Sequence, residues 1–505
     1  MFYSKKSYWL ALLSGALMAT GASLAQDSNK ALLDLLVKKG VLTSQDAMTL
    51  EKEVRSSAAS AQPASTATPV AASKDGKPPL FFKIGAAEFT PFGFLDFTSV
   101  YRNVLNGGDI GSSFGSIPYS NTANSKLSET RFSAKNSRLG LRVDSTFEDM
   151  KVLGYVEADF LGNQPTNINV ASNSDTMRMR VYFADLRKGD WEFLAGQDWS
   201  MMTPNRKGIS PIPGDIFFTQ NVDANYQVGL VWGRTPQIRA VYHATDEFTF
   251  GFSAENPDQY TGSAVVFPTG FNTAQVDNGS NGTATPNVMP DLIGKVAFDT
   301  KLGNLPFHAD AAALYRSFKI NSFSAGTLNS NATADGYGAS FNSNLTIIPG
   351  LQLIENAFWS KGGARYLSTG LGPDLVVNAA DANGAFSIST VQSYAGMLGA
   401  EWDVTPMDKF YGYYGFTAFK AKYSQMSNGN YVGYGFPGSA NSNNRRVEEF
   451  TIGNAYTFWK NPSYGDLKLL AQLSYLQRKP FVVAPGTPSS ANMTMFYLDI
   501  RYDLP

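Results

Sequence analysis

The sequence contains no cysteine and only two histidines among its 505 residues. Without thiols the chain can form neither disulfides nor thiolate metal sites, and His243 and His308 offer little material for a histidine-rich one. Neither charge is in excess, since 41 Lys and Arg stand against 42 Asp and Glu, so the basic footprint of a nucleic-acid protein is missing. We therefore expect no cofactor, no metal and no nucleic-acid partner.

Long apolar runs are also missing from most of the chain. After residue 25, no window approaches the roughly 18 consecutive apolar residues that predict a spanning helix. Hydrophobic residues make up 43% of the chain and charged residues only 16%, with 46 glycines. This composition fits a soluble all-β protein or a membrane β-barrel and excludes a helical membrane protein.

Residues 1–25 have the pattern of a cleaved secretory signal peptide. Lys5 and Lys6 precede an apolar run, and the small-x-small site ends at Ala25. The run is shorter than the roughly 20 residues of a membrane anchor, so we expect cleavage near Ala25 and export of the chain.

The region that follows divides into a helical stub and a linker. Residues 26–56 carry two apolar stripes at helical spacing, separated by Gly40 as a helix stop. They predict a helical hairpin or coiled-coil stub that must self-associate or dock, although a frayed pair of surface helices fits equally well. Residues 57–79 are rich in Ala, Ser, Thr and Pro and predict a linker, so the main domain spans 80–505.

The main domain consists of stretches whose polarity alternates with period two, bounded by Gly, Asn, Asp and Pro. Sixteen candidate strands lie near 91–103, 129–145, 149–161, 176–187, 191–200, 228–243, 247–256, 291–300, 306–319, 334–347, 351–361, 391–404, 409–421, 446–459, 466–479 and 491–503. Their connections alternate strictly between short turns and long Asn-, Ser- and Gly-rich loops, of which 201–227 and 320–333 are examples. This alternation predicts an all-β fold, a closed 16-stranded antiparallel transmembrane β-barrel with a short N-terminal helical segment.

The last strand tests the barrel prediction by its two faces. Phe496, Leu498 and Ile500 alternate with Tyr497 and Asp499, so one face is apolar and the other polar. An apolar face suits lipid, whereas repeated charge on the other face would be costly in a packed protein core. We also expect an interfacial aromatic girdle near strand ends, formed by Tyr411, Tyr413, Tyr414, Phe416, Tyr456, Phe458 and Trp459.

Three segments resemble trimeric Gram-negative porins of the DcaP-like kind. They are ETRFSAKNSRLGLRV from Glu129 to Val143, the stretch from Tyr155 to Phe160, and FLAGQDWSMMTPNR from Phe193 to Arg206. The resemblance covers most of the chain after the signal peptide. It implies a homotrimer in the bacterial outer membrane, a third outer loop folded into the lumen, and uptake of small anions such as dicarboxylates. The C-terminal residue, Pro505, departs from the aromatic with which such barrels usually end.

Strand alternation selects candidate pore-lining residues on the inner face. The basic candidates are Arg131, Lys135, Arg138, Arg142, Arg178, Arg180 and Arg239, and the acidic ones are Glu157, Asp159, Glu192 and Asp198. For both halves of 129–145 to point inward, the strand needs a phase change, such as a bulge, near Asn136 or Ser137. The wall is therefore expected to be mildly basic, with seven basic residues against four acidic ones.

Two interpretations of these charges remain open. A ladder of guanidinium groups could pass a carboxylate or phosphate from site to site without binding it too tightly. Alternatively, the same arginines could pair with Glu157 and Asp159 across strands and stiffen the wall. The loop at 201–227 is expected to form the constriction, with Arg206 or Lys207 facing anions and Asp215 opposing the basic wall; an external loop packed on a neighbouring subunit is the alternative.

An enzyme is not expected. His308 and Asp310 share a strand face, as an outer-membrane lipase would require, but no serine motif accompanies them. The predicted function is passive, mildly anion-favouring diffusion of small solutes. The alternative is a structural or adhesive outer-membrane barrel whose N-terminal stub contacts peptidoglycan or a periplasmic protein. A saccharide pore using lumen aromatics such as Tyr155 or Tyr497 is a third possibility.

Overall fold

The computed structural model describes residues 80–106, 109–162, 175–217, 219–279, 285–367 and 370–505. The predicted signal peptide, helical stub and linker (1–79) lie outside these residues. Within the described residues, no helix is long and apolar enough to cross a membrane.

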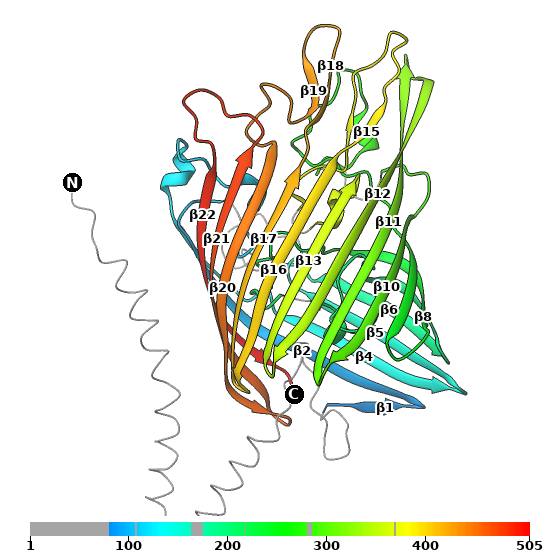
Figure 1. Ribbon diagram of the computed structural model, residues 1–505, viewed down its shortest axis with the longest axis vertical. Helices are drawn as coiled ribbons and strands as arrows, with labels where there is room; N and C mark the ends of the chain where they lie inside the picture. The colour runs from blue at the N-terminus through cyan, green and yellow to red at the C-terminus, as the bar shows by residue number, and fades with distance from the viewer. Residues whose placement is uncertain (1–79, 107–108, 163–174, 218, 280–284, 368–369) are drawn as a thin grey trace, which may run out of the picture. The chain divides into compact units, whose positions relative to one another are not determined.

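The described chain forms a closed, antiparallel, sixteen-stranded barrel (Figure 1). Its strands are β2 (Ala87–Arg102), β3 (Glu129–Ser133) with β4 (Arg138–Phe147), β5 (Met150–Asp159), β6 (Arg178–Lys188), β7 (Trp191–Trp199), β8 (Arg234–His243), β9 (Phe248–Glu255), β10 (Asp291–Leu302), β11 (Leu305–Ser324), β12 (Thr327–Ile348), β13 (Leu351–Lys361), β16 (Gln392–Thr405), β17 (Asp408–Phe419), β20 (Asn444–Asn461), β21 (Gly465–Pro480) and β22 (Ala491–Asp503). The last strand pairs with the first, from Phe94 opposite Asp503 to Arg102 opposite Met495. Closure satisfies the backbone of both terminal strands and leaves no open edge.

Small elements decorate the barrel. They are β1 (Phe82–Ile84), which pairs with the start of β2, the loop hairpins β14 (Leu375–Val377) with β15 (Ile388–Thr390) and β18 (Lys422–Gln425) with β19 (Tyr431–Tyr434), and the 3-10 turns η1 (Phe114–Ser116), η2 (Ala123–Lys126), η4 (Pro213–Asp215), η5 (Thr273–Gln275) and η6 (Ala364–Tyr366).

A bulge divides the second barrel strand into β3 and β4. Ser133 lies opposite Thr98 and Arg138 lies opposite Phe94, so β3 and β4 together contain one residue more than β2 across this stretch. The hydroxyl of Ser137 accepts a hydrogen bond from the backbone N–H of Asp96 at 3.0 Å. The bulge reverses the phase of the strand, as the sequence predicted, and puts residues of β3 and β4 on the same inner face.

The loops follow the predicted alternation, with two corrections. The predicted long loop at 320–333 is instead the tip of a tall hairpin, in which β11 and β12 continue to a two-residue turn at Ala325 and Gly326. This tip projects beyond the barrel wall (Figure 1), so neither of its faces contacts lipid and its sequence shows no apolar alternation. The predicted strand 228–243 begins only at Arg234, and its first six residues belong to the third long loop.

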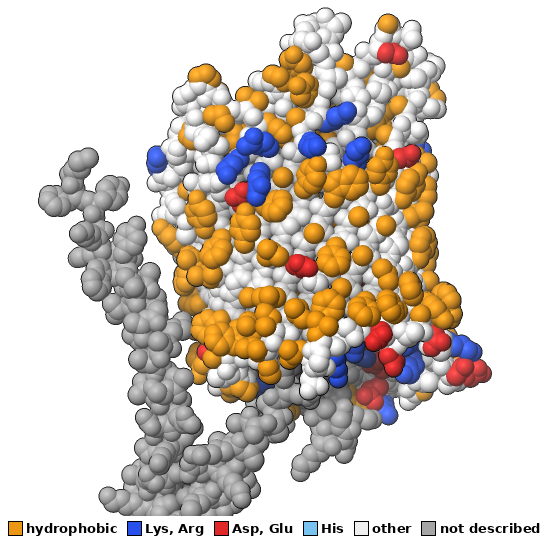
Figure 2. All heavy atoms as spheres, viewed as in Figure 1, with side chains coloured by type: hydrophobic (Ala, Val, Ile, Leu, Met, Phe, Trp, Pro, Cys, Tyr) orange, Lys and Arg blue, Asp and Glu red, His pale blue; other side chains and the backbone are white. Residues whose placement is uncertain are grey.

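The outer face of the barrel is apolar. Its most exposed large side chains include Ile238 at 69% and Phe132 at 64%. Figure 2 shows apolar side chains gathered in an upper and a lower band across the visible face, which is the arrangement of interfacial girdles. Glu355 departs from this pattern, since it lies on the outer face and accepts a hydrogen bond from Ser343 at 2.9 Å.

The girdle prediction was wrong for two residues, Tyr411 and Tyr413. Tyr411 and Tyr413 are buried on the inner face, whereas the next residue, Tyr414, is exposed on the outer face. β17 pairs with β20 without a bulge on its own side from Lys409 to Ala418, so its neighbouring residues point to opposite faces and its four predicted girdle aromatics could not all lie in one girdle. The last strand keeps its predicted faces, with Phe496 and Ile500 exposed and Tyr497 and Asp499 buried.

The apolar outer face predicts a depth-dependent response to charge. Ile238→Arg, in the middle of β8, should lower the free energy of unfolding by about 2–4 kcal/mol because it places a guanidinium at mid-bilayer. Val404→Arg, at an exposed bulge position beside a short turn, should cost roughly 0–1 kcal/mol. Urea unfolding in lipid vesicles measures both, and equal costs would contradict a lipid-facing wall.

Candidate functional site

The third long loop, 200–233, lies inside the barrel and crosses its lumen. Backbone N–H groups of the loop donate to inward side chains of three separated strands. Asn205 donates to Asp310 of β11 at 2.9 Å, Val231 to Asn356 of β13 at 2.9 Å, and Val222 to Gln472 of β21 at 2.8 Å. Because these strands line different parts of the wall, the loop is held from several sides.

Glu449 of β20 is a central anchor for this loop. One carboxylate oxygen accepts from the backbone N–H of Val228 at 2.8 Å, and the other accepts from the side chain of Asn225 at 3.0 Å. The hydroxyl of Thr451 also donates to it, at 3.2 Å. A buried carboxylate with several donors fixes the loop backbone, since each donor would be costly to leave without a partner.

Glycines on the facing strands allow the loop to pack directly on the wall. A Cβ on Gly415 of β17 would collide with the backbone carbonyl of Val228. Gly229 of the loop has φ +93°, and a Cβ on it would collide with the carbonyl of Gly396 on β16. The absence of side chains at these positions therefore sets how closely loop and wall approach.

The predicted constriction residues occupy different settings on this loop. The guanidinium of Arg206 pairs with Glu401 of β16 at 2.7 Å, and Glu401 also accepts from the hydroxyl of Tyr413 at 2.7 Å. Lys207 is exposed, and Asp215 is half-buried. Burial raises the pKa of the Asp215 carboxyl, against a hydrogen bond from Ser210 and the charge of Lys207.

The basic candidates on β4 and β6 converge on two inward carboxylates of β5. Arg180 pairs with Glu157 at 2.6 Å and with Asp159 at 2.8 Å. Arg178 pairs with the same Asp159 at 2.7 Å, and Arg138 approaches Glu157 at 3.5 Å. The structure thus brings these five candidates together as one network on the inner wall.

This network extends to the loop. Arg138 lies 3.5 Å from Asp223 of the loop, and Arg501 of β22 lies 3.0 Å from the same carboxylate. The two guanidinium groups lower the pKa of Asp223 against the opposing effect of its burial. Asp223 therefore attaches the loop to the wall through charge.

The remaining candidates are paired elsewhere on the inner face. Arg239 bonds to Asp198 at 3.1 Å and lies 3.6 Å from Glu192, Arg142 bonds to Asp144 at 2.7 Å, Arg131 bonds to Glu129 at 3.2 Å, and Lys135 pairs with Asp109 and lies 3.7 Å from Asp175. Every one of the eleven wall candidates, seven basic and four acidic, is thus engaged in an ion pair.

Sequence reasoning missed several inward charges. Lys295 is buried and pairs with Asp310 at 3.3 Å, and Arg316 is buried between Asp291 at 3.0 Å and Asp374 at 2.7 Å. Alternation along β10 and β11 could have assigned Lys295 and Arg316 to the inner face. Arg234 was missed because alternation with the inward Arg239 assigns it to the outer face, whereas it stands at the start of β8, where the loop joins the wall. His308 and Asp310, expected as a lumen polar pair, lie on the inner face at 3.3 Å.

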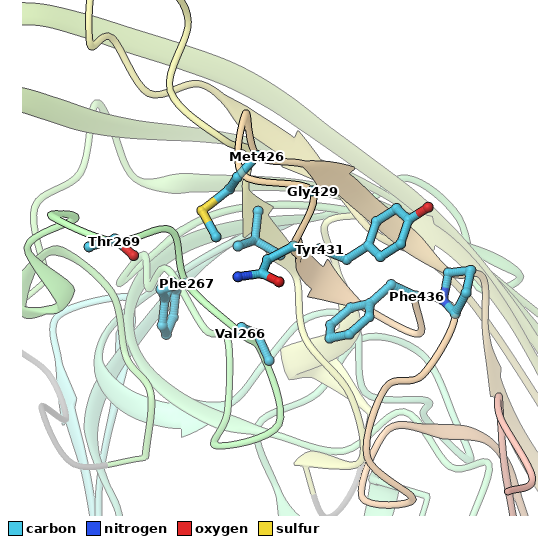
Figure 3. A pocket seen from close by; sticks show the side chains of 10 residues that line it. Val266, Phe267, Thr269, Met426, Gly429, Tyr431 and Phe436 are labelled. Carbon is cyan, nitrogen blue, oxygen red and sulfur yellow. The ribbon is translucent and has the colours of Figure 1, made fainter.

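A separate cavity of about 500 Å³ lies among the outer loops (Figure 3). Val266, Phe267 and Thr269 line one side of it, and residues of the 420–443 loop line the other. Backbone hydrogen bonds in both directions between Val266 and Gly433 join the two loops. No charged side chain lines this cavity, so it is distinct from the charged inner wall.

Comparison with solved structures identifies the fold. The chain is similar to the crystal structure of the outer membrane channel DcaP of Acinetobacter baumannii, with a TM-score of 0.58 and 21% identity over 84% of this chain and 99% of that chain. It also matches OmpF of Salmonella typhi in complex with daunomycin, with a TM-score of 0.45 and 8% identity over 84% and 100% of the two chains. OprB of Pseudomonas putida matches with a TM-score of 0.43 and 11% identity over 82% and 94%.

No model of a known protein family matches the sequence, and the search of curated proteins finds no match. The likeness to DcaP confirms the predicted fold, a sixteen-stranded antiparallel transmembrane barrel.

The close contact between the loop and Gly415 allows a direct test of where the loop lies. Gly415→Leu should release the loop at a cost of about 1–3 kcal/mol, because the new side chain overlaps the Val228 carbonyl. Trypsin cleavage after Lys207 in the folded barrel, followed by mass spectrometry, should then become faster. Gly412→Leu on the same strand is the control, since its Cβ would meet only ordinary contacts at 3.7 Å or more. Equal cleavage of both variants would argue against a loop seated on the wall.

Proposed function

We propose that this protein is a passive channel of the bacterial outer membrane that carries small solutes with a mild preference for anions, and that it works as a homotrimer without a cofactor. The observation that carries this proposal is the closed barrel with an apolar outer face, a charged inner face, and a loop fastened across the lumen. A charged interior is typical of a water-filled lumen, because a dry core would tolerate few such groups. No enzymatic activity is part of the proposal.

The anion preference is supported by which partner of the ion pairs remains exposed. The side chain of Arg178 is 36% exposed while its partner Asp159 is fully buried, and Arg131 is 51% exposed beside a buried Glu129. A passing solute would therefore meet guanidinium groups more than carboxylates at these positions. Asp223 and Asp109 reverse this order, since each is more exposed than its basic partners, which keeps the preference mild.

This arrangement combines the two interpretations left open by the sequence. The arginines are held by carboxylates, as in a stiffening network, while some keep an exposed edge of the planar guanidinium. Such an edge can bind an anion briefly, because the guanidinium stays charged while its carboxylate partner weakens its hold on the anion. Small dicarboxylates are the solute class that we propose, in keeping with the resemblance to DcaP-like porins.

The saccharide pore loses its structural basis. Tyr155 packs against the rings of Phe92 and Phe183, with centroids 4.9 and 5.5 Å away, and is buried. Tyr497 is also buried, and its hydroxyl donates to the backbone of Ile110 at 2.8 Å. Neither ring presents a face on which a sugar could slide.

A structural or adhesive barrel, with the segment 26–56 contacting peptidoglycan or a periplasmic protein, is the competing function. Current through the purified full-length protein in a planar bilayer, under a KCl gradient, separates the two. We expect current steps in groups of three and a reversal potential on the anion side. A correctly folded barrel that carries no current would reject the channel, and a reversal potential on the cation side would reject the anion preference.

Arg178 provides a point test of selectivity. Arg178→Gln should lower the anion-to-cation permeability ratio by roughly twofold, because it removes an exposed cation from the lumen while Asp159 keeps its pair with Arg180. Arg446→Gln is the matched control, since Arg446 has a similar exposure of 37% but lies on the outer face of β20. Reversal potentials in the same KCl gradient measure both, and a shift of equal size in the two variants would refute a local effect.

A further inference from the structure

Arg234 stands where the lumen loop rejoins the wall. It is the first residue of β8 and lies opposite Trp199, the last residue of β7. On β6, the other neighbour of β7, the backbone carbonyl of Arg180 accepts a hydrogen bond from the side-chain amide of Gln197. Gln197 lies two residues before Trp199 on β7. Arg180, Trp199 and Arg234 therefore lie at nearly the same height on three adjacent strands.

Arg234 has no carboxylate partner among the described residues. Its side chain makes no ion pair and no hydrogen bond with them, and its Nη1 atom is buried without an acceptor. The nearby carboxylate of Asp159 is already shared by Arg178 and Arg180, whose charges repel that of Arg234. An unpaired guanidinium beside two others is unfavourable, and a bound anion would relieve the repulsion.

This cation lies against one ring of an aromatic cluster. Its guanidinium lies 5.2 Å from the ring centroid of Trp199, and Trp199 packs on Trp232 with centroids 4.0 Å apart. The ring centroids of Tyr226 and Trp232 are 6.4 Å apart. Arg234, Trp232 and Tyr226 are only half-buried, so solutes can reach the group. The cation thus sits against an apolar, aromatic surface.

We propose that Arg234 is a binding subsite for the carboxylate of a small solute that also carries an apolar or aromatic group. The planar fork of arginine matches a carboxylate, and the adjacent rings offer contact area to the rest of the molecule. The subsite rests on the proposed function, because the solutes it would bind are those that the channel admits. It extends that function from general anion preference to preference among carboxylates.

The test is the equilibrium binding of benzoate to the full-length, detergent-solubilised protein by isothermal titration calorimetry. Wild type should bind benzoate more tightly than acetate. Arg234→Gln should weaken benzoate binding by about tenfold or more, through loss of a charge-assisted pair, while Arg234→Lys should recover part of it. Arg446→Gln on the outer face should bind as wild type does. Retention of heat-modifiable migration in electrophoresis establishes that each variant is folded.

The outcomes of this test and of the bilayer test are separate. Equal benzoate affinity in wild type and Arg234→Gln would overturn the subsite even if the protein conducts. Equal affinity of wild type for acetate and benzoate would overturn the role of the aromatic rings. If Arg234→Gln does not fold, the Lys variant decides, since unchanged affinity there would leave no role for the fork. A protein that binds benzoate through Arg234 but carries no current would retain the subsite and lose the channel.

Discussion

Every part of this structure depends on the two-residue alternation of a closed barrel. Closure between β2 and β22 satisfies the strand backbones, and alternation then commits every second side chain to a confined interior. Charges placed there need partners, and the partners come from adjacent strands at the same height. The pairs of Arg180 with Glu157 and of Arg239 with Asp198 follow from register, which is why the inner wall is a network rather than a set of independent charges.

The lumen loop is also held by side chains of the inner face. Its backbone lacks strand partners, so its N–H groups take acceptors from inward side chains such as Glu449, Gln472 and Asn356. Each of these side chains replaces a ladder hydrogen bond that an irregular segment cannot make. The wall therefore both carries charge and serves as the template on which the loop acquires a fixed shape.

The sequence alone predicted the strand count, the bulge near Ser137 and several strand bounds, because lipid on one side and water on the other enforce alternation. The bounds of β13, Leu351–Lys361, and of β22, Ala491–Asp503, coincide with the predicted ranges 351–361 and 491–503. The tip of the β11–β12 hairpin was missed because both of its faces are polar. Pairing of the arginines with Glu157 and Asp159 was one of the two predicted interpretations. Partners contributed by the loop, such as Asp223, could not be predicted, since they depend on a segment that returns from elsewhere in the chain. Arg234 was not predicted as an inner-wall residue, because alternation from Arg239 assigns it to the outer face and the predicted strand began at Val228, before the junction of loop and wall.

The attachment of the loop also imposes an order on assembly. Its acceptors belong to strands as late in the chain as β20, β21 and β22, including Glu449, Gln472 and Arg501. Until those strands have paired, the resting place of the loop does not exist, although the loop itself is synthesised more than two hundred residues earlier. The loop must therefore stay solvated while the sheet forms around it. Closure of the barrel and docking of the loop then occur together, late in assembly.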